Sequence, residues 1–233
     1  MIMRWDVQGP YEVAFSTRTG GVSEGPYASL NLGRMTGDDV ERVDENRRRL
    51  CAAVGADVDR LALNRQVQST LVHRARPGVR GEPGDGLWTD EVDVPIAALT
   101  ADCLPIAVAR VDGGTPAVAV LHAGWRGLLG GIVAEGVRTL GGAVAAAIGP
   151  AIGPCCYEVG PEVAEPFAAL YGPSVLSGRN LDLWAAAELA LRAEGVTDVE
   201  RVDLCTSCNP GLFFSHRRTG KPRGVQGVIA RVA

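Results

Sequence analysis

The stretch VPIAALTADCLPIAVARVDGGTPAVAVLHAGWRG, residues 94–127, holds three apolar runs separated by short polar breaks. The runs cover residues 94–103, 104–112 and 115–122, and a fourth run follows at residues 143–149. Short continuous apolar runs that contain β-branched residues are typical of strands covered on both faces. We therefore expect four buried strands, and they are the main evidence for the fold class.

Helical patterns surround these runs. Residues 37–55 begin with Asp38 or Asp39 as a candidate N-cap and stop at Gly55, as helices commonly do. Further helices are expected over residues 127–142, 160–172 and 181–196, and further strands over residues 11–18, 199–205 and 224–232. Strands mixed with crossover helices predict the α/β or α+β class. No linker or repeat divides the chain, so residues 1–233 are expected to form a single domain.

Composition excludes several classes of protein. Of the 233 residues, 46% are hydrophobic and 21% are charged, with a formal net charge of −4, which is ordinary for a soluble globular protein. The chain has no overall excess of basic residues, so nucleic-acid binding is not expected. No apolar run in the sequence predicts a signal peptide or a membrane span. We therefore expect a cytoplasmic protein whose six cysteines are reduced. Their uses would then be packing, metal binding or nucleophilic chemistry.

Cys103 and His122 each follow an apolar run. Loops at strand ends gather into sites in layered α/β folds, so the two side chains can meet although they lie 19 residues apart. A thiolate with an imidazole suits zinc or copper, or a cysteine nucleophile with a histidine base. The structural alternative is a buried cysteine and a satisfied histidine near a turn. Arg126 in HAGWRG adds a planar donor for phosphate or carboxylate.

Three other segments carry candidate chemistry. The loop GPAIGPCCYEVG, residues 149–160, contains vicinal cysteines and can line a pocket with backbone amides. CTSC, residues 205–208, is a lone CxxC, which predicts zinc or redox chemistry only weakly without a second pair. FFSHRR, residues 213–218, combines aromatic rings with arginines and suits an anion or a base. A second arginine cluster, at residues 46–49, is interpreted as a solvated helix face.

Taken together, these motifs resemble a known family. FSTRTGGVSEGPYASLNLG, TADCLPI, VLHAGWRG, GPAIGPCCYEVG and LFFSHRR occur in the order and spacing of the laccase-domain proteins, also called polyphenol oxidases, peptidoglycan editing factors or purine nucleoside phosphorylases. The resemblance runs from about residue 13 to about residue 230. It implies a single layered sandwich with mixed β-sheets, in a mostly monomeric cytosolic protein. It also implies a metal site, usually zinc, built from histidine, cysteine and histidine.

Two of these ligands carry over as Cys103 and His122, but the third position differs. The family's first ligand is the histidine of a QVH motif, and this chain has QVQ, which ends in Gln68. His73 lies five residues further on, and an odd separation along a strand points a side chain to the opposite face. A bulge could restore it, but the spacing to Asp85 favours Gln68 at the site. An amide oxygen is a poor zinc ligand, so we expect zinc to be weakly bound or absent, with copper also possible.

The resemblance implies phosphorolysis of adenosine, inosine and 5′-methylthioadenosine, together with adenosine deamination. Its partners would be a nucleoside and phosphate, with no nucleic acid and no membrane. The predicted catalytic residues are Asp102, Cys103, His122 and Arg126, and the predicted substrate or phosphate ligands are Arg18, Asn31 and Arg217. Asp102 would orient a ligand or move a proton, unless it is a structural carboxylate at a turn.

Three other functions are considered. A hydrolase that edits cell-wall precursors would use the same metal site, and the sequence does not separate it from purine chemistry. A degenerate, metal-poor member with a binding role is favoured by Gln68. A copper polyphenol oxidase is disfavoured, because multicopper oxidation needs more ligands than three histidines can supply.

Overall fold

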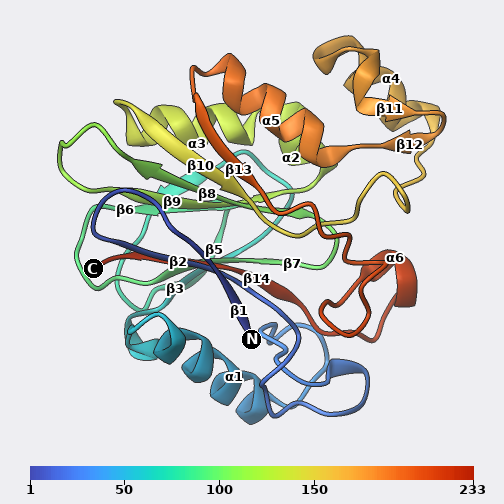
Figure 1. Cartoon of the computed structure of the whole chain (residues 1–233). Helices are drawn as coiled ribbons and strands as arrows, with labels where there is room; N and C mark the ends of the chain where they lie inside the picture. The colour runs from blue at the N-terminus through green and yellow to red at the C-terminus, as the bar shows by residue number, and fades with distance from the viewer.

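The computed structural model describes all 233 residues, and two six-stranded sheets lie face to face at its centre (Figure 1). The first sheet has the order β1 (Ile2–Trp5), β2 (Tyr11–Ser16), β14 (Gln226–Val232), β7 (Ile96–Thr100), β3 (Ala62–Arg65) and β5 (Arg80–Pro83). The second has the order β13 (Asp198–Arg201), β10 (Val144–Ile148), β8 (Leu104–Arg110), β9 (Val118–Ala123), β6 (Gly86–Thr89) and β4 (Val72–Arg74). Both sheets contain parallel and antiparallel pairs.

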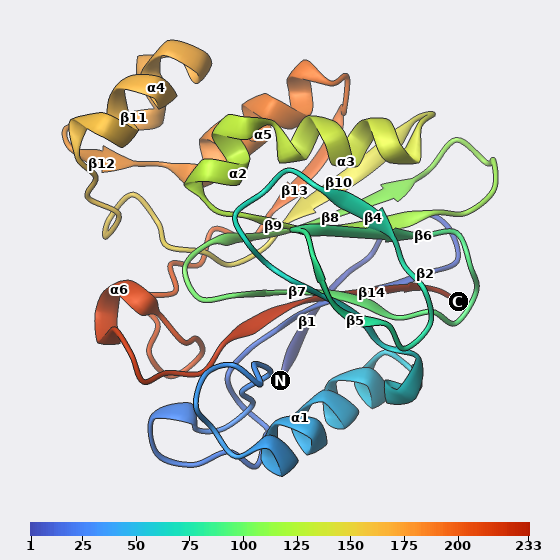
Figure 2. The same ribbon diagram turned by 180° about the vertical axis from the view of Figure 1, so that it is seen from behind.

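Helices cover the two outer faces (Figures 1 and 2). The first sheet is covered by α1 (Val40–Ala53), and the second by α2 (Trp125–Gly130), α3 (Ile132–Leu140) and α5 (Leu183–Ala193). The remaining elements are α4 (Pro161–Tyr171), α6 (His216–Thr219), the hairpin β11 (Leu176–Ser177) and β12 (Asn180–Leu181), and 3-10 turns at Gly25–Tyr27, Val58–Arg60 and Pro173–Val175. No helix combines the length and apolar character needed to cross a membrane.

The four apolar runs are strands buried on both faces, which confirms the mixed α+β class. Along β8 and β9, Ala107 and Val120 pack between the sheets, whereas Ile106 and Leu121 pack beneath the helices. Successive side chains of a strand point to opposite faces, so a strand between two apolar layers must be apolar throughout.

One helix prediction was wrong in detail. Residues 127–142 were expected to form a single helix, but the chain forms α2 and α3 with a break between them. Gly131 has φ 93° at the junction, a left-handed conformation that ends α2 and turns the backbone into α3. The expected helix over residues 37–55 is α1, and its N-cap is Asp39, whose carboxylate accepts from the amides of Glu41 and Arg42.

Strand register brings three loop junctions to one end of the second sheet. Leu104 at the start of β8 pairs with Ala123 at the end of β9, and Pro105 pairs with His122. On the other side of β9, Gly86 at the start of β6 pairs with Leu121. Residues just outside these strands, including Cys103, therefore lie beside His122.

Candidate functional site

Cys103 and His122 are neighbours because of this register. Cys103 is the last residue of the turn that leaves β7 in the first sheet and enters β8 in the second, and His122 is next to last in β9. His122 is only 6% exposed. Burial by itself lowers the pKa of His122, but the Cys103 thiolate and the Asp85 carboxylate outweigh that effect and raise the pKa to about 9. The sequence prediction that these two residues can meet is thus matched by the geometry.

Asp85 forms hydrogen bonds with two parts of the site, His122 on β9 and the loop that contains Gln68. Its Oδ1 lies 2.8 Å from His122 Nδ1 and accepts from the amide of Gln68. Its Oδ2 accepts from the amides of Val67 and Ser69 and from Ser69 Oγ. Burial raises the pKa of Asp85, but the bonds from His122, Ser69 and Val67 more than offset this and lower it to about 2. An ionised carboxylate therefore orients the imidazole and holds the loop that carries Gln68.

Gln68 is placed at the site by backbone geometry as well as by Asp85. It has φ 62°, which is uncommon for a residue with a side chain. Its amide lies against Gly124, where an added Cβ would overlap the Gln68 side chain. His73 lies elsewhere, on β4, and its Nε2 is 2.9 Å from the carbonyl oxygen of Pro83. The structure thus brings Gln68, and not His73, to Cys103.

A cavity of about 380 Å³ opens beside Cys103. Its lining residues come from three loops and from the first turns of α2, α5 and α6, and they include Gln68, Asp102, Cys103, Trp125, Arg126, Ile152, Tyr157, Leu183, His216 and Arg217. Two arginines lie over aromatic rings: the guanidinium of Arg126 is 4.1 Å from the Trp125 ring centre, and that of Arg217 is 5.2 Å from the Tyr157 ring centre. The cavity therefore offers flat apolar surfaces next to positive charge.

Asp102 joins three loops at the base of this cavity. Its Oδ1 accepts from Thr206 Oγ1 at 2.6 Å, and its Oδ2 accepts from the amide of Arg217 at 2.6 Å. Its own carbonyl accepts from the amide of Ile152. With φ 91° and 8% exposure, Asp102 is held in a strained turn by these bonds. Both carboxylate oxygens are therefore engaged in structural bonds.

Arg18 and Asn31 do not line the cavity. Arg18 donates to the carbonyls of Ala28 and Pro210 and lies over the Phe214 ring. Asn31 is fully buried, and it donates to Thr36 and Asp38 while its Oδ1 accepts from the amides of Gly33 and Val225. The polar groups of both residues hold neighbouring loops together. Their role as substrate ligands stays a prediction.

Three features escaped the sequence analysis. Asp85 was used there only as a landmark, and His216 was noted only within FFSHRR, although it lines the cavity. The scarcity of histidine was the available signal for His216. The third feature is a cluster of four cysteines, Cys155, Cys156, Cys205 and Cys208, which lie close enough together to hold a metal ion. CTSC does have a second pair of cysteines, brought to it by the fold from 50 residues upstream.

Comparison with known proteins places the chain in a family. The family model described as "Multi-copper polyphenol oxidoreductase laccase" matches residues 12–232. The chain belongs to this laccase-domain family. It is 38% identical to the purine nucleoside phosphorylase YlmD of Geobacillus stearothermophilus, over 91% of this chain and 85% of that protein. It is 40% identical to a purine nucleoside phosphorylase of Deinococcus radiodurans, over 94% and 89% of the two chains.

Solved structures of family members share the fold. The crystal structure of a Neisseria meningitidis protein superposes with a TM-score of 0.89 and 34% identity, over 99% of this chain and 98% of that one. The crystal structure of Geobacillus stearothermophilus YlmD gives a TM-score of 0.86, over 96% and 92%. The names of the curated relatives support a purine nucleoside phosphorylase-like function. Oxidation by several copper ions, which the family description names, would need more imidazole ligands than the chain's three histidines supply.

Proposed function

We propose that this chain catalyses phosphorolysis of the purine nucleosides adenosine, inosine and 5′-methylthioadenosine, and deamination of adenosine, as a cytoplasmic monomer. The observation that carries the proposal is the cavity beside Cys103, which combines a thiol and one histidine, His216, with two arginine–aromatic pairs. The names of the relatives support the coarser part of the proposal, purine nucleoside phosphorolysis.

The cavity walls suit the two substrates. A purine is flat and apolar on its faces, and the rings of Trp125 and Tyr157 are surfaces on which it can stack. Phosphate is an anion that guanidinium groups bind through paired hydrogen bonds. Arg126 and Arg217 line the same cavity and take this role in the proposal. Asp102 acts as a positioning residue, because its hydrogen bond to the Arg217 amide fixes the position of the Arg217 backbone.

In phosphorolysis, a phosphate oxygen forms a bond to C1′ of the ribose while the bond from C1′ to N9 of the purine breaks. The base leaves with the bonding electron pair and takes up a proton. His216 borders the cavity and His122 lies behind Cys103, so imidazole groups are available as the acid. Proximity of phosphate and ribose supplies much of the rate enhancement in such a site.

The donor set suits zinc at two positions and fits poorly at the third. The bond from His122 Nδ1 to Asp85 leaves Nε2 to face a metal, as is usual for metal-binding histidines, and Cys103 supplies a thiolate. Gln68 offers only a neutral amide. A bound zinc ion would supply Lewis-acid chemistry for deamination. The site therefore holds zinc weakly, and the proton on His122 must leave before zinc binds.

The test is release of hypoxanthine from inosine in the presence of phosphate. The wild-type chain should release it in proportion to phosphate, and Cys103→Ala should not. If the wild type shows no phosphate-dependent turnover of any of the three nucleosides, the proposal is wrong.

A binding role without catalysis is the second candidate, and the observation favouring it is Gln68 at the position of a metal ligand. In that case the wild type should bind a nucleoside, measured by calorimetry, without converting it. Gln68→His separates the two candidates, because it restores the imidazole without changing the rest of the cavity.

A further inference from the structure

Two loops bring four thiols together outside the Cys103 cavity. Cys155 and Cys156 lie in the loop between β10 and α4, and Cys205 and Cys208 lie in the loop that follows β13. The loops run side by side, because Ala151 forms a parallel bridge with Cys205. All four Sγ atoms lie within 4.8 Å of one another.

The spacing of these sulfur atoms suits a shared metal ion. Cys208 Sγ is 3.5 Å from Cys155 Sγ and 3.4 Å from Cys156 Sγ. Four thiolates around one zinc ion, each at about 2.3 Å, are separated from one another by about 3.8 Å. A disulfide would require about 2.05 Å. The amide of Gly153 donates to Cys205 Sγ at 3.3 Å, and such outer bonds commonly orient metal ligands.

We propose that Cys155, Cys156, Cys205 and Cys208 bind one zinc ion as a closed structural site, separate from the Cys103 cavity. Soft thiolate ligands and tetrahedral spacing favour zinc over harder cations. Cys205 is followed by Thr206, whose Oγ1 donates to Asp102. Cys155 and Cys156 provide the second pair of cysteine ligands, which the segment CTSC does not contain.

The zinc ion would link the two cysteine-containing loops, and both loops lead to residues that line the Cys103 cavity. The first loop carries Ile152 and Tyr157, and the second leads to Arg217. Arg217 already reaches across by donating to the carbonyl of Glu158 at 3.0 Å. Losing the zinc should therefore loosen the substrate pocket as well as lower the stability of the protein.

Metal analysis of purified protein tests the site. Cys103→Ala should retain about one zinc ion per chain, whereas Cys208→Ser in the same background should retain almost none. Ser207→Ala, which alters the same loop without removing a thiol, is the control and should retain the zinc. Cobalt substituted into Cys103→Ala should show the intense near-ultraviolet thiolate bands of a tetrathiolate site, and Cys208→Ser should abolish them.

Cys155→Ser provides a second variant if Cys208→Ser does not fold. The inference is wrong if Cys103→Ala contains no zinc, or if zinc content is unchanged when Cys208 or Cys155 is replaced. It is also wrong if thiol titration of the denatured, unreduced wild type shows fewer than six free thiols, because a disulfide would then occupy the cluster. None of these outcomes depends on nucleoside turnover.

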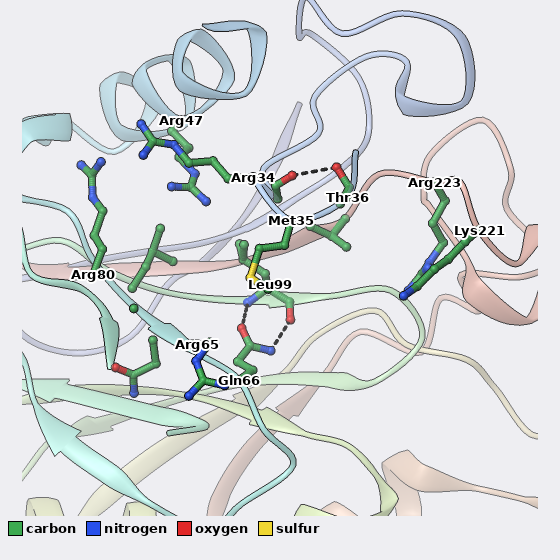
Figure 3. Close-up of a pocket in the computed structure, with 15 residues that line it drawn as sticks. Arg34, Met35, Thr36, Arg47, Arg65, Gln66, Arg80, Leu99, Lys221 and Arg223 are labelled. Atoms are coloured by element: carbon green, nitrogen blue, oxygen red, sulfur yellow. Dashed lines mark hydrogen bonds between the residues drawn. The ribbon is translucent and has the colours of Figure 1, made fainter. Parts of the chain in front are cut away.

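A second, independent feature is a basic cavity of about 520 Å³ between α1 and the first sheet (Figure 3). Six cationic side chains line it, from five separate parts of the chain: Arg34, Arg47, Arg65, Arg80, Lys221 and Arg223. None of its fifteen lining residues is acidic, although the whole chain has a net charge of −4. Like charges gathered in one cavity repel one another unless an anion joins them.

Most of these cations lack a carboxylate partner. Among them only Arg34 forms an ion pair, with Asp44. Arg47 is 7% exposed, and Arg223 has a buried Nε without a hydrogen-bond partner. Figure 3 shows Arg223 and Lys221 converging on one side, with Arg65 at the base and Arg47 and Arg80 opposite. A buried guanidinium nitrogen without an acceptor indicates a place for an anionic ligand.

The cavity also has an apolar part. Met35 is 85% exposed at its edge, and Leu63, Leu99 and Val225 complete the apolar lining. We infer that this cavity binds a chain of two or three phosphoryl groups, with the apolar part available to a nucleoside attached to it. Gln66 lines the cavity and bonds to both backbone groups of Leu99, so the ligand would contact the segments that lead to Gln68 and Cys103.

Calorimetry with ATP, ADP, tripolyphosphate and orthophosphate tests the inference. ATP should bind, and replacing both Arg65 and Lys221 with alanine should weaken it by about tenfold or more. Arg138→Ala, on α3, is the control and should leave binding unchanged. Equal binding of tripolyphosphate would identify a polyphosphate, and much weaker binding would identify a nucleotide. No binding of ATP or tripolyphosphate, or orthophosphate binding as tightly as both, would overturn the inference.

Discussion

Asp85→Asn tests the role of the Asp85 carboxylate, which holds His122 and the loop of residues 67–69 in place. The carboxylate accepts five hydrogen bonds, from the amides of Val67, Gln68 and Ser69, from Ser69 Oγ and from His122 Nδ1. Asparagine keeps one acceptor oxygen and turns an NH2 group toward donors. Each hydrogen bond to a charged group contributes about 1.5–3 kcal/mol, but such bonds are not additive, so we expect a total loss of about 2–4 kcal/mol.

The pKa of Asp85 leads to a similar magnitude. A pKa lowered from 3.8 to about 2 on folding corresponds to about 2 kcal/mol of stability. Because the folded pKa is the lower one, this contribution is complete above pH 3.8 and is lost as the pH falls towards 2. The stability gap between wild type and Asp85→Asn should therefore be largest between pH 3.8 and 6.5. It should shrink in acid as Asp85 is protonated, and it should also shrink as the pH rises towards about 9, because His122 then loses the proton that Asp85 stabilises.

Urea unfolding at a series of pH values measures this gap. Ser69→Ala, which removes a single donor to the same carboxylate, should cost about 1 kcal/mol and serves for comparison. A gap below about 0.5 kcal/mol at pH 7, the usual range for surface changes, would refute the reasoning. So would a gap that grows as the pH falls from 3.8 towards 2.

Three further predictions concern the same region. Gln68→His should raise zinc affinity by about tenfold or more, measured by competition with a chelator. Gly124→Ala should displace the Gln68 amide and lower turnover more than stability, seen by comparing kcat with the unfolding midpoint. Asp102→Ala leaves Thr206 Oγ1 and the Arg217 amide without their acceptor, so it should cost about 1–3 kcal/mol in unfolding free energy and raise KM for phosphate.

Much of the fold was predictable from local pattern. The apolar runs that form β7, β8, β9 and β10 are continuous because each strand lies between two apolar layers. Nearly every side chain of such a strand must therefore be apolar, and the pattern is visible in the sequence. The break at Gly131 was harder to predict, because glycine is compatible both with a helix and with its end.

The candidate site was partly predictable for a related reason. Cys103, His122 and Gln68 stand out through residue type and motif, and strand-end loops gather in such folds. Arg18 and Asn31 have equally suggestive types, but their polar groups hold loops together. Residue type alone does not show which acceptors surround a side chain.

The sequence by itself determined the layered α+β class and the four buried strands, and its resemblance to the laccase-domain family predicts that Gln68 stands at the position of a histidine ligand. Only the tertiary structure decided that Asp85 orients His122, that His216 reaches the cavity, and that Cys155 and Cys156 join Cys205 and Cys208. The reason is physical. Periodicity records the environment of one segment, whereas a site joins residues from distant segments through strand register and loop packing, which depend on the whole chain.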